Sequence, residues 1–202
     1  MKQLFKKIKG IDLIILATFV TTVAYSSTYP YIHKIMISNV DTGLIALTNI
    51  VDCVAVIIVD RIWQLKGNKM YEKYELLCIL ECVTTVSTTL YVLTTHNIVA
   101  YYILDIIMFS ITTRNIICGG RRLRAIRYST EESRINYENN NSTAESAATL
   151  IGSGIAIILG LPFEVMLIIA TIGNCIDNIF YIKIYRETKK QRTIEENLEF
   201  FD

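Results

Sequence analysis

Residues 74–94 read YELLCILECVTTVSTTLYVLT, and this stretch decides what kind of protein the chain can be. It has the roughly 20 mostly apolar residues that a helix needs to cross the hydrocarbon core of a bilayer. Glu75 stands at its start, but Glu81 stands close to its middle. A charge there costs at least ~2.5 kcal/mol, even on the most lenient insertion scale. The stretch therefore predicts a transmembrane helix in which Glu81 has a function, a wet cavity or a buried partner.

Five other stretches have a similar length and composition. They cover residues 11–32, 43–60, 97–118, 144–162 and 164–184. Of the 202 residues, 52% are apolar and only 2 are proline, which is typical of integral membrane proteins. The sequence thus predicts an all-α fold, a single polytopic membrane domain over residues 1–202 with six transmembrane helices. The lipid bilayer is its first expected partner.

The net charge of +1 conceals a strong asymmetry along the chain. All of the 20 Lys and Arg residues except Lys34 fall in the predicted tails, at the neighbouring helix ends, or in the connections after the second and fourth helices. By the positive-inside rule these regions face the cytoplasm. We therefore expect both termini, the tails 1–10 and 185–202, and the connection 119–143 to be cytoplasmic, in a bacterial cell membrane. This charge pattern does not favour nucleic acid as a partner.

The fifth predicted helix carries two signals. Ser142 and Glu145 have the spacing of a capping box, which predicts that the helix begins near Ala144. Small residues then recur at every fourth position, and this spacing predicts a face for close helix packing, within the bundle or against another chain. These small residues are Ala148, Gly152, Ala156 and Gly160.

Four of the six stretches carry a carboxylate near the midpoint, namely Asp52, Glu81, Asp105 and Asp177. With a helical rise of ~1.5 Å per residue, Asp52, Glu81 and Asp177 fall in one layer at or just below the midplane. Asp105 falls nearer the outer side. All four are candidates for binding a proton or a substrate. Each of them could instead be protonated and hydrogen-bonded to a nearby hydroxyl, without a further function.

Amides and one guanidinium complete the set of polar candidates. Asn49, Asn174 and Asn178 stand within one helical turn of Asp52 or Asp177. Arg114 is the only cation predicted to be buried. It could neutralise one or two of the acids, or extend to the inner interface.

The outer end of the predicted bundle holds both histidines, His33 and His96. The cysteines lie inside the predicted spans, so no Ser-His or Cys-His pair is expected at a common depth, and we expect neither an enzyme nor a metal site or cofactor. Tyr25, Tyr29 and Tyr101 are also expected toward the outer interface, where tyrosine is common.

Asp60 and Arg61 end the second stretch and are followed by Gly67 and Lys69. This arrangement resembles the Gly-x-x-x-Asp-Arg-x-Gly-Arg-Lys loop in the N-terminal half of major facilitator superfamily transporters. Val56 occupies the first glycine position, and the second glycine comes about one helical turn late.

Two further patterns are similar to the same superfamily. The segment from Ala148 to Ala156 resembles a drug-efflux and antiport motif, Gly-x-x-x-Gly-Pro-x-x-Gly-Gly, with Ser153 in place of proline. Arg114 and Gly119 resemble an Arg-x-x-x-Gly pattern with one residue added. Residues 127–140 resemble the entry to the fifth helix in macrolide-efflux-like members.

The resemblance implies one six-helix half of a transporter that needs two halves. A homodimer or a partner half would then move a small organic or drug-like solute by alternating access, with proton coupling through the acids. Asp60, Arg61, Gly67 and Lys69 would form a cytoplasmic gate. Two alternatives remain open: a substrate-binding subunit of an energy-coupling transporter, and a non-transport membrane protein for immunity or assembly.

Overall fold

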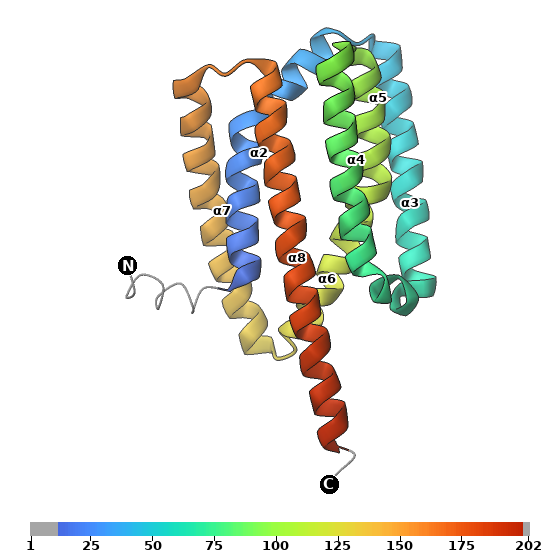
Figure 1. Cartoon of the computed structure of the whole chain (residues 1–202), viewed down its shortest axis with the longest axis vertical. Coiled ribbons are helices and arrows are strands. Elements are labelled where there is room, and N and C mark those ends of the chain that lie inside the picture. Colours follow the sequence, from blue (N-terminus) through green and yellow to red (C-terminus); the bar gives the residue numbers. More distant parts are fainter. Residues whose placement is uncertain (1–11, 200–202) are drawn as a thin grey trace.

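The computed structural model of this chain describes residues 12–199, except for the side chains of 109, 156, 157, 159 and 191–199. Every secondary-structure element in this part is a helix (Figure 1). The elements are α2 (Leu13–Ser38), α3 (Thr42–Glu72), α4 (Tyr74–Thr95), α5 (Ile98–Met108), the π-helical turn η1 (Phe109–Thr113), α6 (Arg114–Arg127), α7 (Glu131–Leu159) and α8 (Phe163–Glu199). Since α5, η1 and α6 are continuous, the described residues form six rods, as the sequence predicts. The predicted tail 1–10 lies outside the described residues.

Five of the rods have the length and apolar composition of a membrane-spanning helix. They run through Leu13–Ser38, Thr42–Glu72, Tyr74–Thr95, Ile98–Arg127 and Phe163–Lys190. The remaining rod, α7, is polar over residues 131–143 and becomes apolar only from Ala144 onward. The prediction of an all-α chain with several helices fit to cross a membrane is therefore confirmed.

The connection between α3 and α4 is a single residue, Lys73. The predicted second helix ended at Asp60, but α3 continues to Glu72 and has one non-helical residue, Lys66, at φ −129° and ψ 22°. The predicted loop after Asp60 is therefore mostly helix. Polar residues can extend a helix because its backbone hydrogen bonds are made within the helix itself.

The predicted connection 119–143 is also helical, apart from residues 128–130. α7 begins at Glu131, so the prediction of a start near Ala144 is wrong. Its N-cap is Thr130, whose hydroxyl accepts a hydrogen bond from the backbone N–H of Ser133 at 3.3 Å. Glu131 and Glu132 place negative charge at the positive end of the helix dipole, which favours this earlier start. The predicted tail 185–202 is likewise helical as far as α8 reaches.

The rods pack as two groups of three that lie side by side (Figure 1). In one group α2 packs against both α7 and α8, and in the other the α5–η1–α6 rod packs against both α3 and α4. The two groups meet mainly where α4 packs against α8.

These principal contacts are preserved when each rod is exchanged for the one three places later in the chain. The exchange turns α2 into the α5–η1–α6 rod, α3 into α7, and α4 into α8. The pair α2 and α7 then becomes the α5–η1–α6 rod and α3, while the pair α4 and α8 maps onto itself. The contacts of α6 with α8 and of α3 with α4 depart from this pattern. Because successive rods are antiparallel, a shift by three reverses the direction. The principal contacts therefore have the pattern of two inverted three-helix units, the first with α2, α3 and α4 and the second with the α5–η1–α6 rod, α7 and α8, and each packed group holds rods of both units.

The small-residue face of α7 packs against α2 of the same chain. Ala148 is fully buried, and a Cβ on Gly152 would lie 2.4 Å from Ser26 Oγ and 2.7 Å from the backbone oxygen of Val23. The prediction of a close-packing face is confirmed at these two positions. Gly160 instead caps the helix with φ +48° and has open space around it, and the Ala156 side chain lies outside the described residues.

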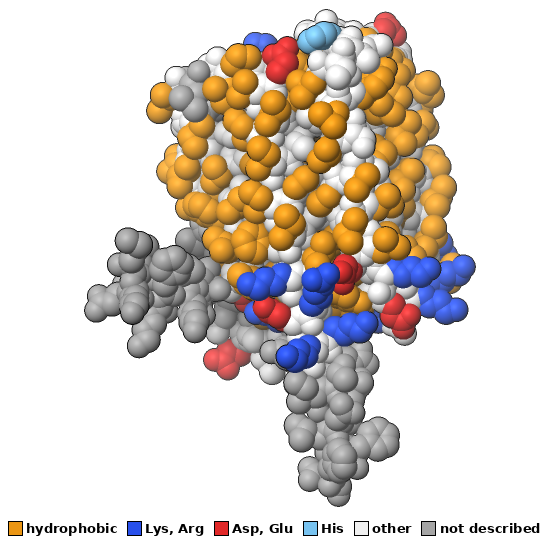
Figure 2. Space-filling model, in the orientation of Figure 1, with side chains coloured by type: hydrophobic (Ala, Val, Ile, Leu, Met, Phe, Trp, Pro, Cys, Tyr) orange, Lys and Arg blue, Asp and Glu red, His pale blue; other side chains and the backbone are white. Residues whose placement is uncertain are grey.

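Apolar side chains cover the middle of the molecule in a broad belt (Figure 2). Many large side chains are strongly exposed within this part of the chain, including Leu150 (77%) and Ile158 (80%) on α7. Lys and Arg side chains gather at one end of the belt, where the α3–α4 connection lies. An apolar belt of this kind, with basic side chains gathered at one end, is typical of proteins whose helices cross a membrane.

Candidate functional site

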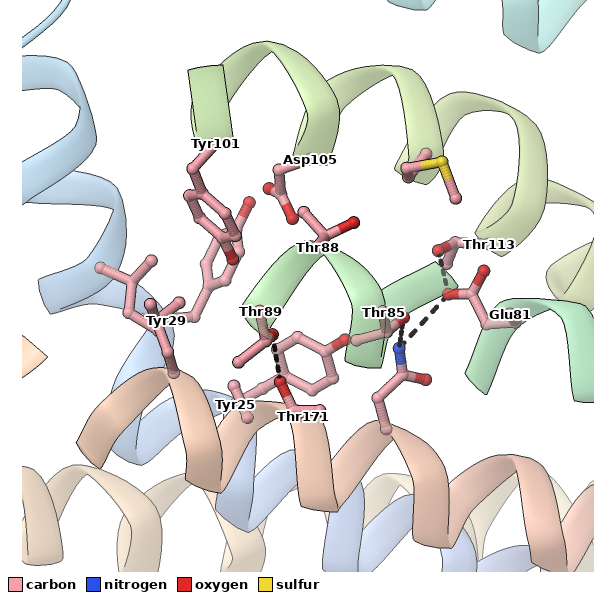
Figure 3. Close-up of a pocket in the computed structure, with 15 residues that line it drawn as sticks. Tyr25, Tyr29, Glu81, Thr85, Thr88, Thr89, Tyr101, Asp105, Thr113 and Thr171 are labelled. Carbon is pink, nitrogen blue, oxygen red and sulfur yellow. Dashed lines mark hydrogen bonds between the residues drawn. The ribbon is translucent and has the colours of Figure 1, made fainter. Parts of the chain in front are cut away.

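A cavity of about 260 Å³ lies between α2, α4, the α5–η1 segment and α8 (Figure 3). Because α2 and α4 belong to one three-helix unit and α5 and α8 to the other, the cavity is formed by both repeats. Its described lining includes two carboxylates, Glu81 and Asp105, and five threonine hydroxyls. The threonines are Thr85, Thr88, Thr89, Thr113 and Thr171.

Glu81 is the most deeply buried acid of this cavity, with 2% of its surface exposed. Its Oε1 accepts a hydrogen bond from Thr113 Oγ1 at 2.6 Å and from Asn174 Nδ2 at 3.3 Å (Figure 3). The same Asn174 amide also donates to Thr85 Oγ1 at 3.0 Å. By contrast, Oε2 of Glu81 is buried without a hydrogen-bond partner among the described residues. Only one of its two carboxylate oxygens is therefore satisfied by the protein.

Asp105 on α5 lines the same cavity and a second one of about 190 Å³. The second cavity also holds Asn49, Asp52 and His33. Asp52 accepts a hydrogen bond from Ser110 Oγ at 2.5 Å. Asp105 thus stands in the wall that the two cavities share.

The π-helical turn η1 holds two of these acids in place. Ser110 and Thr113 both belong to it, and they donate to Asp52 on α3 and to Glu81 on α4, respectively. A π-turn changes the direction in which side chains leave the helix and is frequent at functional sites. The apolar pattern of residues 97–118 gives no signal for this turn, so the sequence predicted a regular helix there.

The acids that share a cavity are not the acids that were predicted to share one depth layer. Glu81 shares its cavity with Asp105, whereas Asp177 is not among the described lining residues of either cavity. Asn178 is buried and donates to the backbone oxygen and to Oδ1 of Asn174 at 3.0 and 2.8 Å. It therefore orients Asn174, which reaches the cavity.

Arg114 lies away from the cavities and binds Asp60. Its Nε and Nη2 donate to the two carboxylate oxygens at 2.8 and 2.5 Å, and both side chains are partly exposed. Cys118 Sγ lies 3.4 Å from Asp60 Oδ1. Asp60 of the predicted gate and Arg114, the cation predicted to be buried, thus form one ion pair between α3 and α6.

The other predicted gate residues lie on α3. Arg61 is exposed and donates to Gln64 Oε1 at 3.1 Å, and Lys69 is exposed. Gly67 is buried beneath Arg122, since a Cβ there would lie 2.8 Å from Arg122 Nη1.

Sequence reasoning missed two polar features of this region. Tyr25, Tyr29 and Tyr101, which were expected at the outer interface, line the larger cavity. Trp63 Nε1 donates to Asn115 Oδ1 at 2.8 Å and so joins α3 to α6 beside the ion pair. Helical periodicity could have placed Tyr25 and Tyr29 on one face of α2, since they stand one turn apart.

Within residues 12–199, no group of three or more His, Cys, Asp or Glu side chains could hold a metal ion. In comparisons with known proteins, no family model, no curated protein and no solved structure matches this chain.

Proposed function

We propose that this chain is a membrane transport protein that moves a small solute by alternating access, and that the cavity between α2, α4, α5 and α8 is its solute site. The observation that carries the proposal is the position of the cavity at the junction of two inverted three-helix units. In secondary transporters built from inverted repeats, the substrate site lies at the interface between the repeats. The cavity also lies between the two packed groups, and rocking of the α2, α7 and α8 group against the other group would open it to either side.

The electrostatics of the cavity support proton coupling. Glu81 and Asp105 both line it, and its described lining contains no Lys, Arg or His. Ionised carboxylates without a counter-charge are costly in the middle of an apolar bundle. A proton or a cationic occupant must therefore compensate them. If protons and a cationic solute took turns at these carboxylates, each carboxylate would be compensated in both states, and transport of the solute would be coupled to protons.

The Asp60–Arg114 pair lies within one packed group, since α3 and α6 both belong to the group of α3, α4 and the α5–η1–α6 rod. The pair therefore supports a group that moves as one rigid body, rather than a lock that opens between the two groups. The residues that the superfamily resemblance makes a cytoplasmic gate, Asp60, Arg61, Gly67 and Lys69, all lie on α3 of this group. In a cell membrane, the positive-inside rule would turn the end rich in Lys and Arg toward the cytoplasm.

The described lining residues of the cavity come from α2, α4, the α5–η1 segment and α8 of this chain. A homodimer of the kind that the resemblance implies would carry two such cavities.

Transport can be tested with the purified protein in liposomes that contain a pH-sensitive dye. A panel of small cationic, zwitterionic, neutral and anionic solutes is added outside under an imposed proton gradient. We expect at least one class to cause solute-dependent proton movement, and Glu81→Gln and Asp105→Asn to abolish it. Glu164→Gln, a matched change at an exposed position on α8, should leave it intact. Correctly folded protein that moves no solute of the panel would overturn the proposal, and solute binding without flux would favour a binding subunit.

A further inference from the structure

Three tyrosine rings line the larger cavity. Tyr25 and Tyr29 come from α2 and Tyr101 from α5, and the first two have ring centroids 6.0 Å apart in an edge-on arrangement. In Figure 3 Tyr29 and Tyr101 lie toward one side with Asp105 beside Tyr101, Glu81 lies toward the other side, and the ring of Tyr25 lies between them. The faces of aromatic rings attract cations, and cages of such rings are a known means of binding organic ammonium groups.

Glu81 lines the cavity with a carboxylate that the protein compensates only in part. It is 2% exposed, and its Oε2 has no hydrogen-bond partner among the described residues. A buried acceptor without a partner is destabilising, and more so when it is charged. Arg114, the cation predicted to be buried, is bound to Asp60 and so is not available to it. A positively charged occupant of the cavity would compensate an ionised Glu81.

Size and lining chemistry distinguish an organic cation from a metal ion. No set of three or more metal-ligating side chains exists in the described part of the chain, whereas rings and threonine hydroxyls make up much of the cavity wall. Metal ions prefer several oxygen, nitrogen or sulfur ligands to aromatic faces. A volume of about 260 Å³ lies near the lower end of the ~300–1,000 Å³ that is usual for small-molecule sites, so the occupant is small.

We infer that the cavity binds a small organic ammonium ion, which the carboxylates of Glu81 and Asp105 attract by charge and the rings of Tyr25 and Tyr101 attract by their faces. This inference rests on the proposed function, since it names the class of solute for the same site. The tyrosine faces would contact alkyl groups on nitrogen, and Glu81 would compensate the positive charge.

Isothermal titration calorimetry of the purified, full-length protein in detergent tests the inference. The probes are choline, n-butylammonium and 3,3-dimethylbutan-1-ol, the last being a neutral isostere of choline. We expect choline or butylammonium to bind saturably and the neutral alcohol to bind at least ~10-fold more weakly, because it lacks the positive charge that the carboxylates and the ring faces attract. Glu81→Gln should weaken cation binding by a similar factor, whereas Glu164→Gln should not.

Tyrosine variants separate ring contacts from hydroxyl contacts. Tyr101→Phe keeps the ring and should bind the cation nearly as well as the wild type, while Tyr101→Leu and Tyr25→Leu should bind it several-fold more weakly. Tyr91→Leu serves as the control, because Tyr91 is 39% exposed and lies outside the described cavity lining. A circular-dichroism melt of each variant shows that it is folded.

Two results would overturn the inference: equal affinity for choline and its neutral isostere, or no heat of binding for either cation with folded protein. The liposome assay keeps this failure distinct from failure of the proposed function. Flux of only neutral or anionic solutes would refute the ammonium site and leave transport standing. Saturable, Glu81-dependent cation binding without any flux would refute transport and leave the ammonium site standing.

Discussion

Arg114, at the start of α6, binds Asp60 of α3 through two hydrogen bonds of 2.8 and 2.5 Å. Each residue was predicted to act elsewhere, Arg114 beside the acids within the bundle and Asp60 in a loop motif. Their pairing joins α3 to α6 within one packed group of rods.

A double-mutant cycle can measure this ion pair. Asp60→Asn and Arg114→Gln should each lower the stability of the protein in detergent, and the double variant should be more stable than the sum of the two losses predicts. Because the side chains are 22% and 35% exposed, we expect a coupling energy of about 1 kcal/mol, below that of a fully buried pair. The measurement is thermal unfolding followed by circular dichroism. Strictly additive effects would show that the pair contributes nothing.

Gly119→Ala should destabilise the packing of α6 against α4. A Cβ at this position would lie 2.2 Å from the ring of Tyr74, which is fully buried and donates to the backbone oxygen of Ile116 at 3.2 Å. Overpacking of this kind typically costs about 1–3 kcal/mol. Gly154→Ala is the matched control, since a Cβ there meets nothing within 4 Å. In the helix interior that control should raise stability by up to about 1 kcal/mol, so a similar effect of both changes would contradict the packing argument.

Thr113→Val should affect both stability and solute-dependent activity. The change removes the hydroxyl that donates to Glu81 Oε1 at 2.6 Å, and leaves Asn174 as the described donor to this carboxylate. A buried acceptor that loses its partner typically costs about 1–3 kcal/mol. Thr94→Val provides the comparison, because Thr94 is exposed and donates only to backbone oxygens of its own helix. Unfolding temperatures and liposome flux are measured for both, and equal behaviour of the two variants would argue against a role for the η1 turn.

Tyr128, which follows α6, gives a prediction about pH. Burial, and then the hydrogen bond that its hydroxyl donates to Asp12, raise the pKa of this tyrosine above its usual value of about 10. A group whose pKa is raised by folding adds stability that is fully present below its unfolded pKa. That stability is lost as the pH rises toward the higher folded pKa. The stability of the wild type should therefore fall above about pH 10 more steeply than that of Tyr128→Phe.

The phenylalanine variant is a close match because it keeps the ring that stacks on Tyr137 at a centroid distance of 4.4 Å. Below pH 9 it should be about 1 kcal/mol less stable than the wild type, the usual net value of one hydrogen bond. Chemical unfolding at several pH values provides the measurement. Parallel stability curves for the two proteins would show that Tyr128 does not titrate differently in the folded state.

The sequence by itself determined the helices and their order, because a run of about 20 apolar residues and the charges that flank it are local properties. The same reasoning located Glu81 and Asp105 in apolar surroundings and marked Ala148 and Gly152 as a packing face. It misjudged where α3 ends and α7 begins, since polar residues beside an apolar stretch can continue a helix as easily as they can end it. The sequence predicted a capping box at Ser142, whereas the structure caps α7 at Thr130, where Glu131 and Glu132 follow in the first turn.

Only the tertiary structure decided which side chains meet. Depth along each helix predicted that Asp177 lies beside Glu81. In the structure Asp105 shares the cavity with Glu81 instead, because its side chain leaves α5 toward the cavity. The η1 turn alters that direction locally and brings Ser110 and Thr113 to two different acids. Arg114 reached Asp60 because α3 and α6 pack side by side, a contact between residues 54 positions apart. Hydropathy specifies how deep a residue lies in a membrane helix. The partners of that residue depend on how the helix is rotated and which helices lie beside it, and both are fixed by packing.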